Sequence, residues 1–202
     1  MEFHRYAAVV VLSTLILIAI GAYMTSQAAG RQPVSRGLIN AVIHRDAAVV
    51  VIILALGLAL WLSAAQEAPF LGWIAAGLLV LDGWAGWLGQ PLLHATLAPL
   101  AFSILLAIAL LSSSRWNDMP ELVHDQVSPL LRRLAIAGPP LVLLQTLLGA
   151  AYRHKLTGVI PHLMGAMIVS IALLVAATLV MQHHPLHREL RSAARWMMSI
   201  LL

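Results

Sequence analysis

The sequence predicts an all-α polytopic membrane protein, and two observations carry this prediction. Hydrophobic residues make up 61% of the chain and charged residues 10%, whereas a soluble domain carries about 25% charge. Apolar runs recur that reach the length of about 20 residues needed to cross a bilayer. The sequence contains no cysteine, which excludes disulfides, iron–sulfur clusters and thiolate ligands. Its basic residues lie at helix ends and not in one patch, which argues against a nucleic-acid partner.

Six complete spans are expected in chain order. Their approximate bounds are 6–28, 44–64, 70–89, 92–113, 130–152 and 159–182. The connecting loops are short, apart from the charged segment 114–129, which we interpret as a cytoplasmic linker. The domain organisation predicted in this way is an N-terminal four-helix half at 1–113, the linker at 114–129, and an incomplete C-terminal half at 130–202.

The last residues predict the beginning of a seventh span. After the basic stretch 188–195, the chain becomes apolar again at 196–202. Seven apolar residues cannot cross a bilayer, so the favoured interpretation is a fragment of a longer protein. A short interfacial helix, with its arginines at the lipid headgroups, is the alternative.

The basic residues also predict an orientation. With the N-terminus in the cytoplasm, seven basic residues lie inside and five outside, the outer ones being Arg31, Arg36, Arg45, Arg153 and Lys155. Cytoplasmic loops carry the excess of Lys and Arg. This favours a cytoplasmic N-terminus in a bacterial-type cytoplasmic membrane.

An internal repeat relates spans one and two to spans five and six. Gly21-Ala22-Tyr23 closes span one, as Gly149-Ala150-Ala151-Tyr152 closes span five. His44 and His162 each open the span that follows. Repeats of this kind commonly place membrane sites by symmetry. Since His94 follows His44 by 50 residues, a partner for His162 is expected about ten residues beyond Leu202.

Three histidines, His44, His94 and His162, stand where the chain enters the membrane from one side, near the outer face. A haem iron is held by axial ligands, and His–His ligation needs two facing helices with imidazoles at matching depth. His44 and His94 suit one haem between them. Intramembrane ionisable residues are functional candidates by default, although a single histidine is more commonly a packing or interhelical hydrogen-bonding residue. These three are our candidate iron ligands.

Charged residues near these histidines complete the candidate site. Arg45 and Arg153 could clamp haem propionates, because arginine pairs with carboxylates bidentately; interfacial snorkelling is the alternative reading of the basic residues here. Asp82, inside span three, is a candidate for a proton or substrate role. It could equally be a polar position at a helix contact, as could Gln145, since each stands four residues before a glycine. Asp46 is a further catalytic candidate, or the ion-pair partner of an arginine.

Several short segments occur in an order and spacing that point to a family. They are Gly21–Ser26 with Ala29–Gly30, His44–Arg45, Leu88–Gly89 leading to Leu93–His94, Gln145–His154, Pro161–His162 and Gly165–Ala166. Together they resemble the haem A synthase family, which acts in cytochrome oxidase assembly. The resemblance runs along the whole chain and stops where the family has two further helices.

The resemblance implies two pseudo-symmetric four-helix bundles, of which six helices are present here and a seventh is begun. It implies that the C-terminal half binds haem b through His162, and that His44 and His94 flank haem O as the substrate. The reaction expected from the resemblance oxidises the C8 methyl of haem O to a formyl group. Expected partners are haem O synthase, cytochrome oxidase assembly factors or an electron donor; formation of a homo-oligomer stays open.

Two departures from the family keep an alternative open. Many members carry a glutamate three residues before the histidine of span two, and here that residue is Ala41. The cysteine pair found in many bacterial members is also missing. The alternative is a diverged haem b-binding protein, an electron carrier or assembly factor, without hydroxylase activity. A transporter or structural subunit without haem is a third reading.

Overall fold

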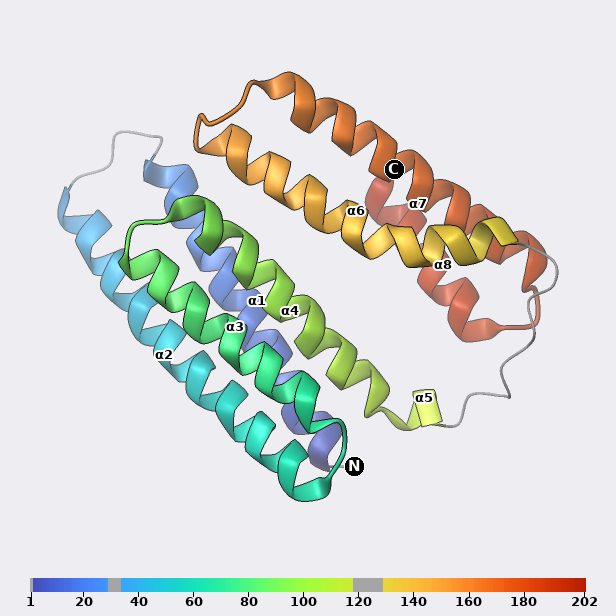
Figure 1. The fold of residues 1–202 in the computed structure, drawn as a ribbon, viewed down its shortest axis with the longest axis horizontal. Helices are drawn as coiled ribbons and strands as arrows, with labels where there is room; N and C mark the ends of the chain where they lie inside the picture. Colours follow the sequence, from blue (N-terminus) through green and yellow to red (C-terminus); the bar gives the residue numbers. More distant parts are fainter. Residues whose placement is uncertain (1, 29–33, 118–128) are drawn as a thin grey trace. The chain divides into compact units, whose positions relative to one another are not determined.

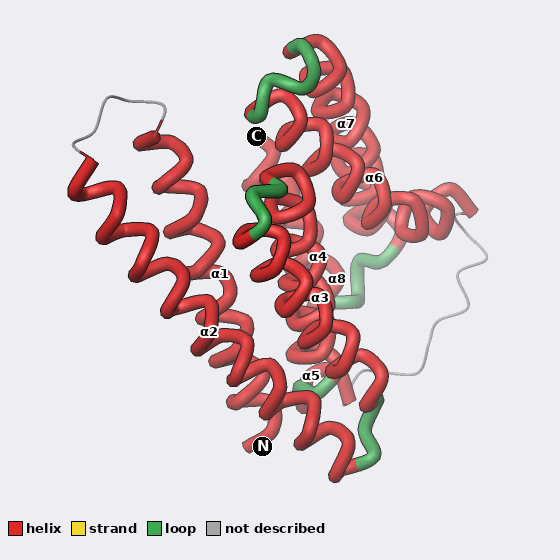
Figure 2. Tube along the Cα trace, turned by 60° about the vertical axis from the view of Figure 1, so that its left-hand side comes forward, coloured by secondary structure: helices red, strands yellow, loops and turns green. Residues whose placement is uncertain are grey.

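The structure is a computed structural model that describes residues 2–28, 34–117 and 129–202. Within these ranges the chain consists of helices joined by loops (Figures 1 and 2). It divides into two compact units, unit 1 at residues 1–120 and unit 2 at residues 121–202. The boundary falls inside the segment 114–129 that the sequence marks as a linker, and most of that segment lies outside the described residues.

The helices of unit 1 are α1 (Glu2–Ala28), α2 (Val34–Ala65), α3 (Pro69–Trp87), α4 (Pro91–Leu111) and the single-turn α5 (Ser114–Asn117); those of unit 2 are α6 (Pro129–Arg153), α7 (Val159–His183) and α8 (Arg188–Leu201). The expected spans agree with these bounds to within a few residues, except that α2 begins ten residues before His44. His44 therefore lies well inside a helix, but the apolar span itself runs from Ala41 to Ala65, so His44 stands near the start of its span as predicted.

Proline and left-handed backbone set several of the helix ends. Pro69 and Pro91 occupy the first turns of α3 and α4, where the missing N–H costs nothing because that group has no intrahelical partner. Gly89 (φ 65°) turns the chain between α3 and α4, and Lys155 (φ 60°) turns it after α6. Both hairpins are tight, which brings the end of one helix beside the start of the next.

In unit 1 the long helices α1–α4 form a closed ring in which each packs against two neighbours, α1 against α4 included (Figure 1). Small residues dominate the buried positions, among them Ala7, Ala55, Ala59, Ala75, Ala76 and Ala101. A Cβ atom placed on Gly72 of α3 would lie 2.9 Å from the Cα of Ala59 on α2. Small residues that let backbones approach this closely are typical of helix packing in membranes.

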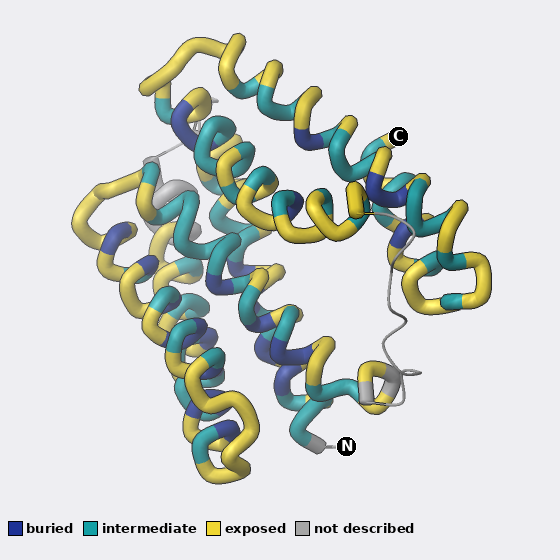
Figure 3. The backbone as a smooth tube through the Cα atoms, turned by 45° about the vertical axis from the view of Figure 1, so that its right-hand side comes forward, coloured by how far each residue is buried: buried dark blue, intermediate teal, exposed yellow. Residues whose placement is uncertain are grey.

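The outward faces of the helices are apolar, so the chain is an integral membrane protein. Figure 3 shows exposed positions recurring along every long helix, and they include large hydrophobic side chains such as Leu12, Ile53, Leu81, Ile136 and Met167. Six helices are long and apolar enough to cross a membrane: α1, α2, α3, α4, α6 and α7. A soluble bundle would present polar faces there.

Unit 2 is more open than unit 1. Helix α7 packs against both α6 and α8, but α6 and α8 do not pack against each other. Helix α8 has 14 residues, which is about 21 Å at 1.5 Å per residue and too short to cross the membrane. It is one continuous helix that includes the basic stretch as well as the apolar end, with Ala194 buried against α7 and Trp196 exposed.

Candidate functional site: glycine–histidine hairpins

The three candidate histidines share one local arrangement. Each stands near the start of its apolar span and lays its imidazole over a glycine of the preceding helix. A Cβ atom placed on that glycine would lie 3.0 Å from Cε1 of His44 at Gly21, 3.3 Å from Nδ1 of His94 at Gly86, and 3.0 Å from Cε1 of His162 at Gly149. The helix pairs are α1–α2, α3–α4 and α6–α7. Any larger residue at these glycines would displace the ring.

The equal distances at Gly21 and Gly149 bear on the internal repeat. In both hairpins Cε1 of the histidine is the atom nearest to a Cβ placed on the glycine, at 3.0 Å, although the second-nearest atom is Nε2 in His44 and Nδ1 in His162. The packing of a histidine ring on a glycine of the preceding helix is thus common to the two sequence segments that make up the repeat.

In unit 1 the folding of the ring brings His44 and His94 together. Their ring centroids lie 6.2 Å apart and their ring planes are nearly perpendicular, at 82°. Both rings are half-buried. The Nδ1 atom of His44 is buried and has no hydrogen-bond partner among the residues that the structure describes. A buried polar atom without a partner is uncommon and calls for an explanation.

Asp82 is the carboxylate that stands at this pair. It is a buried residue of α3 with 7% of its surface exposed. The Nδ1 atom of His94 donates a hydrogen bond to the backbone carbonyl oxygen of Asp82 at 3.1 Å, and it lies 3.0 Å from the carboxylate oxygen Oδ1. Because a carbonyl oxygen only accepts, the proton of neutral His94 must sit on Nδ1. Its Nε2 atom is then left with a lone pair that can bind a metal.

In unit 2 the partner of the histidine is an amide. Gln145 Nε2 donates to the backbone carbonyl oxygen of His162 at 3.0 Å and lies 2.9 Å from its Nδ1 atom. The ring of Tyr152 stacks on His162, with centroids 5.9 Å apart and planes 9° apart. With the amide turned this way, Nδ1 accepts and the proton sits on Nε2. Ligation through Nε2 would need the amide to turn over so that Gln145 Oε1 accepts from Nδ1.

The remaining candidates lie on the surface. Arg45 and Asp46 pair with each other at 3.9 Å, with 73% and 69% of their side chains exposed, so Asp46 is an ion-pair partner of an arginine, which the sequence left as one of its two readings. Arg153 is exposed at the end of α6. Ala41 is exposed too. Of the acidic candidates, Asp82 is the one that stands beside a histidine.

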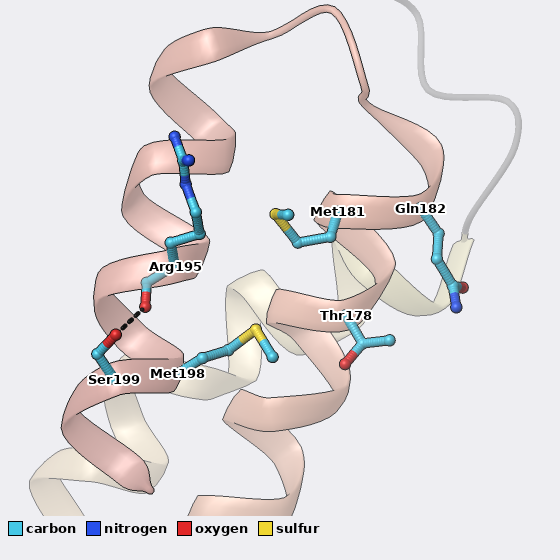
Figure 4. A pocket seen from close by; sticks show the side chains of 6 residues that line it. All are labelled: Thr178, Met181, Gln182, Arg195, Met198 and Ser199. Carbon is cyan, nitrogen blue, oxygen red and sulfur yellow. Dashed lines mark hydrogen bonds between the residues drawn. The ribbon is translucent and has the colours of Figure 1, made fainter.

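Unit 2 also contains a groove between α7 and α8 that is separate from the histidines. Figure 4 shows its lining, with Met181 and Met198 extending into the gap and the Ser199 hydroxyl donating to the Arg195 carbonyl oxygen at 2.9 Å. Thr178 and Gln182 complete the α7 side. Thr178 lies 16 residues from His162, about 24 Å along the helix axis. The groove therefore does not extend the histidine site.

The sequence singled out the three histidines but did not predict the residues that contact them. Asp82 and Gln145 each precede a glycine by four residues, which suggested a helix-packing role for both. In the structure both side chains contact the imidazole that packs on that glycine. The signal was present, because residues four apart share a helix face. What was missing was the knowledge of which helix that face meets.

Comparison with known proteins adds no assignment: no family model, no curated protein and no solved structure matches the chain. Within the described part of the chain, no group of three or more histidine, cysteine, aspartate or glutamate residues is arranged to hold a metal ion. The arrangement that is present is a pair of imidazoles, His44 and His94, that lie edge to face with their ring centroids 6.2 Å apart.

Proposed function

We propose that this chain is a haem-binding membrane enzyme of the haem A synthase type, which oxidises the C8 methyl group of haem O to a formyl group. The observation that carries the proposal is the close pair of His44 and His94, from α2 and α4, with ring centroids 6.2 Å apart. The segments that resemble the family include both residues and the repeated hairpin of His162. Turning the methyl into a formyl group removes electrons and protons and adds one oxygen atom, so an electron acceptor from outside the chain takes up the electrons, and water or dioxygen supplies the oxygen atom.

The pair suits a haem in spacing and in chemistry. The ring centroids of His44 and His94 lie 6.2 Å apart, close enough for both imidazoles to hold one metal through bonds of about 2.0 Å each. Haem supplies its own equatorial nitrogens, so a third protein ligand is not needed. His94 has its Nε2 lone pair available, because its Nδ1 proton is bonded to Asp82.

Unit 2 would hold a resident haem b in the same scheme. His162 is its ligand in this chain, and Tyr152 stacks on that ring. Haem b bound there would supply a redox-active iron. Arg45 and Arg153 are exposed at the ends of their spans near the histidine-bearing hairpins, where they could pair with propionates at the membrane surface.

The alternative is a haem b-binding protein, an electron carrier or assembly factor, that does not oxidise its haem. One observation favours it: Ala41 stands in place of the glutamate of many family members and offers no carboxylate. In the enzyme reading, Asp82 would have to serve instead, since Asp46 is exposed and paired with Arg45. Under either reading, the protein lies in a bacterial-type cytoplasmic membrane with its N-terminus in the cytoplasm and its haem sites near the outer face.

Pigment analysis tests the proposal. The full chain would be expressed in a host that makes haem O, purified in detergent, and analysed by reduced-minus-oxidised spectra and pyridine haemochrome. Bound haem that falls in His94→Ala but not in His187→Ala, a histidine of the α7–α8 connection, supports haem binding at the pair. Haem A in the extract supports the enzyme, and haem b alone supports the carrier. A colourless protein after haem supplementation would refute both.

A further inference from the structure

The three glycine–histidine hairpins differ at one position, the residue four before the glycine. That residue lies one turn before the glycine on the same helix face. It is Asp82 in the His94 hairpin and Gln145 in the His162 hairpin, and both contact the Nδ1 atom of the imidazole. In the His44 hairpin it is Leu17, which is buried and has no polar atom to offer.

We propose that His94 and His44 are unequal ligands, with His94 fixed by Asp82 and His44 replaceable, so that small ligands enter the unit 1 haem site on the His44 side. The inference rests on the proposed haem binding and deepens it. Asp82 is then a positioning residue, which acts through His94. Leu17 matters because its apolar side chain offers His44 no hydrogen bond.

The Asp82–His94 contact fixes both the tautomer and the orientation of the ring. The carbonyl oxygen of Asp82 accepts the Nδ1 proton at 3.1 Å, and the carboxylate stands 3.0 Å from the same nitrogen. A carboxylate beside the second nitrogen of a histidine raises the basicity of the nitrogen that binds the metal. Residues in this role hold a ligand in place, and their loss typically costs about 10–100-fold in metal affinity or activity.

His44 lacks this support. Its Nδ1 atom is buried without a hydrogen-bond partner in the described ranges, so no hydrogen bond there selects the tautomer that leaves Nε2 free. The ring instead rests on Gly21, with Cε1 as the nearest atom to the position of an added Cβ. If the His44–iron bond broke, no hydrogen bond of the His44 ring would be lost with it. The ring could then turn toward water, which would give its buried Nδ1 atom a hydrogen-bond partner. The His44 bond is thus the weaker of the two.

Carbon monoxide binding to the ferrous haem measures which bond opens. All variants would be made in a full-length His162→Ala background, so that bound haem reports on unit 1 alone. We expect His44→Ala to keep its haem and to bind carbon monoxide at least tenfold more tightly than the parent. We expect His94→Ala to bind haem at least tenfold more weakly. Equal loss of haem in the two variants would overturn the inference.

Two milder substitutions separate this role from simple misfolding. Leu17→Gln would place an amide at His44 whose oxygen can accept the Nδ1 proton, which leaves Nε2 free for the metal, so carbon monoxide affinity should fall. Asp82→Asn keeps the size of the side chain but removes its charge, so the ferric state loses stabilisation and the midpoint potential should rise. Loss of the fold would not lower carbon monoxide affinity in the Leu17 variant and raise the midpoint potential in the Asp82 variant. No change in either measurement would overturn the inference while leaving haem binding intact.

The parent protein distinguishes failure of the inference from failure of the proposed function. A low-spin, six-coordinate spectrum in the His162→Ala background shows that both histidines of unit 1 bind one haem. If the parent takes up no haem, the proposed function fails before any comparison of the ligands is made. If it takes up haem and His94→Ala behaves like His44→Ala, the function stands and the inequality is wrong.

Discussion

The Nδ1 atom of His94 lies 3.1 Å from the backbone carbonyl oxygen of Asp82 and 3.0 Å from its carboxylate. This contact joins α3 to α4 across the tight turn at Gly89. It places the buried Asp82 carboxylate beside a candidate metal ligand, although its Oδ1 atom has no hydrogen-bond partner in the described ranges. Intramembrane carboxylates are costly, so the Asp82–His94 contact bears on both the fold and the candidate site.

Gly149→Ala should destabilise unit 2 and reduce haem binding there. The new Cβ would lie 3.0 Å from Cε1 and 3.3 Å from Nδ1 of His162, and the ring cannot move freely because Gln145 and Tyr152 contact it. Overpacking of this kind costs about 1–3 kcal/mol. Thermal unfolding in detergent and haem content measure the two effects.

The matched control for Gly149→Ala is Gly77→Ala, because a Cβ at Gly77 has nothing within 4 Å. That change should leave haem content unaltered and be neutral or stabilising, since glycine inside a helix is about 0.5–1 kcal/mol less favourable than alanine. If Gly149→Ala unfolds at the same temperature as Gly77→Ala, the close packing of His162 on Gly149 is not important for stability.

Gly72→Ala should loosen the α2–α3 interface by about 1–3 kcal/mol. The added Cβ would lie 2.9 Å from the backbone Cα of Ala59, which cannot give way as a flexible side chain can. Gly83→Ala is a control on the same pair of helices, because its Cβ would make only an ordinary contact of 3.6 Å with Ile52. Thermal unfolding of the two variants in one detergent should separate them, and equal melting temperatures would contradict the packing argument.

The sequence was sufficient to predict the spans but not the assembly of the site. Apolar runs set the helices, because the bilayer fixes their length, and glycines with matching histidines revealed the repeat. The approach of His44 to His94 depends on how α1–α4 close into a ring, which hydropathy does not encode. Helix α2 begins before its apolar span, because residues 34–40 are helical without being apolar enough to belong to the span.

Tyr6→Phe should cost about 1 kcal/mol. The Tyr6 hydroxyl donates to the Leu54 carbonyl oxygen at 3.0 Å, and it packs against Gly57 on α2. Its removal leaves the ring packed on Trp61, with centroids 5.6 Å apart, so only the hydrogen bond is lost. Tyr23→Phe on the exposed face of α1 is the control and should be neutral. A melting temperature for Tyr6→Phe equal to that of Tyr23→Phe would show that the Tyr6–Leu54 bond contributes nothing.

Single cysteines should reveal alternating loops across the membrane, because the natural chain has none to interfere. With six spans, Glu67 and Leu186 lie on the side of the N-terminus, whereas Gln90 and Thr157 lie on the opposite side with the three histidine hairpins. A membrane-impermeant thiol reagent applied to intact cells should label Gln90→Cys and Thr157→Cys, and should label Glu67→Cys and Leu186→Cys only after the cells are opened. The reverse pattern would invert the orientation, with the haem sites near the cytoplasm. Labelling of Gln90→Cys but not Thr157→Cys would contradict the six-span topology, because these two loops must share a side if α4 and α6 both cross the membrane.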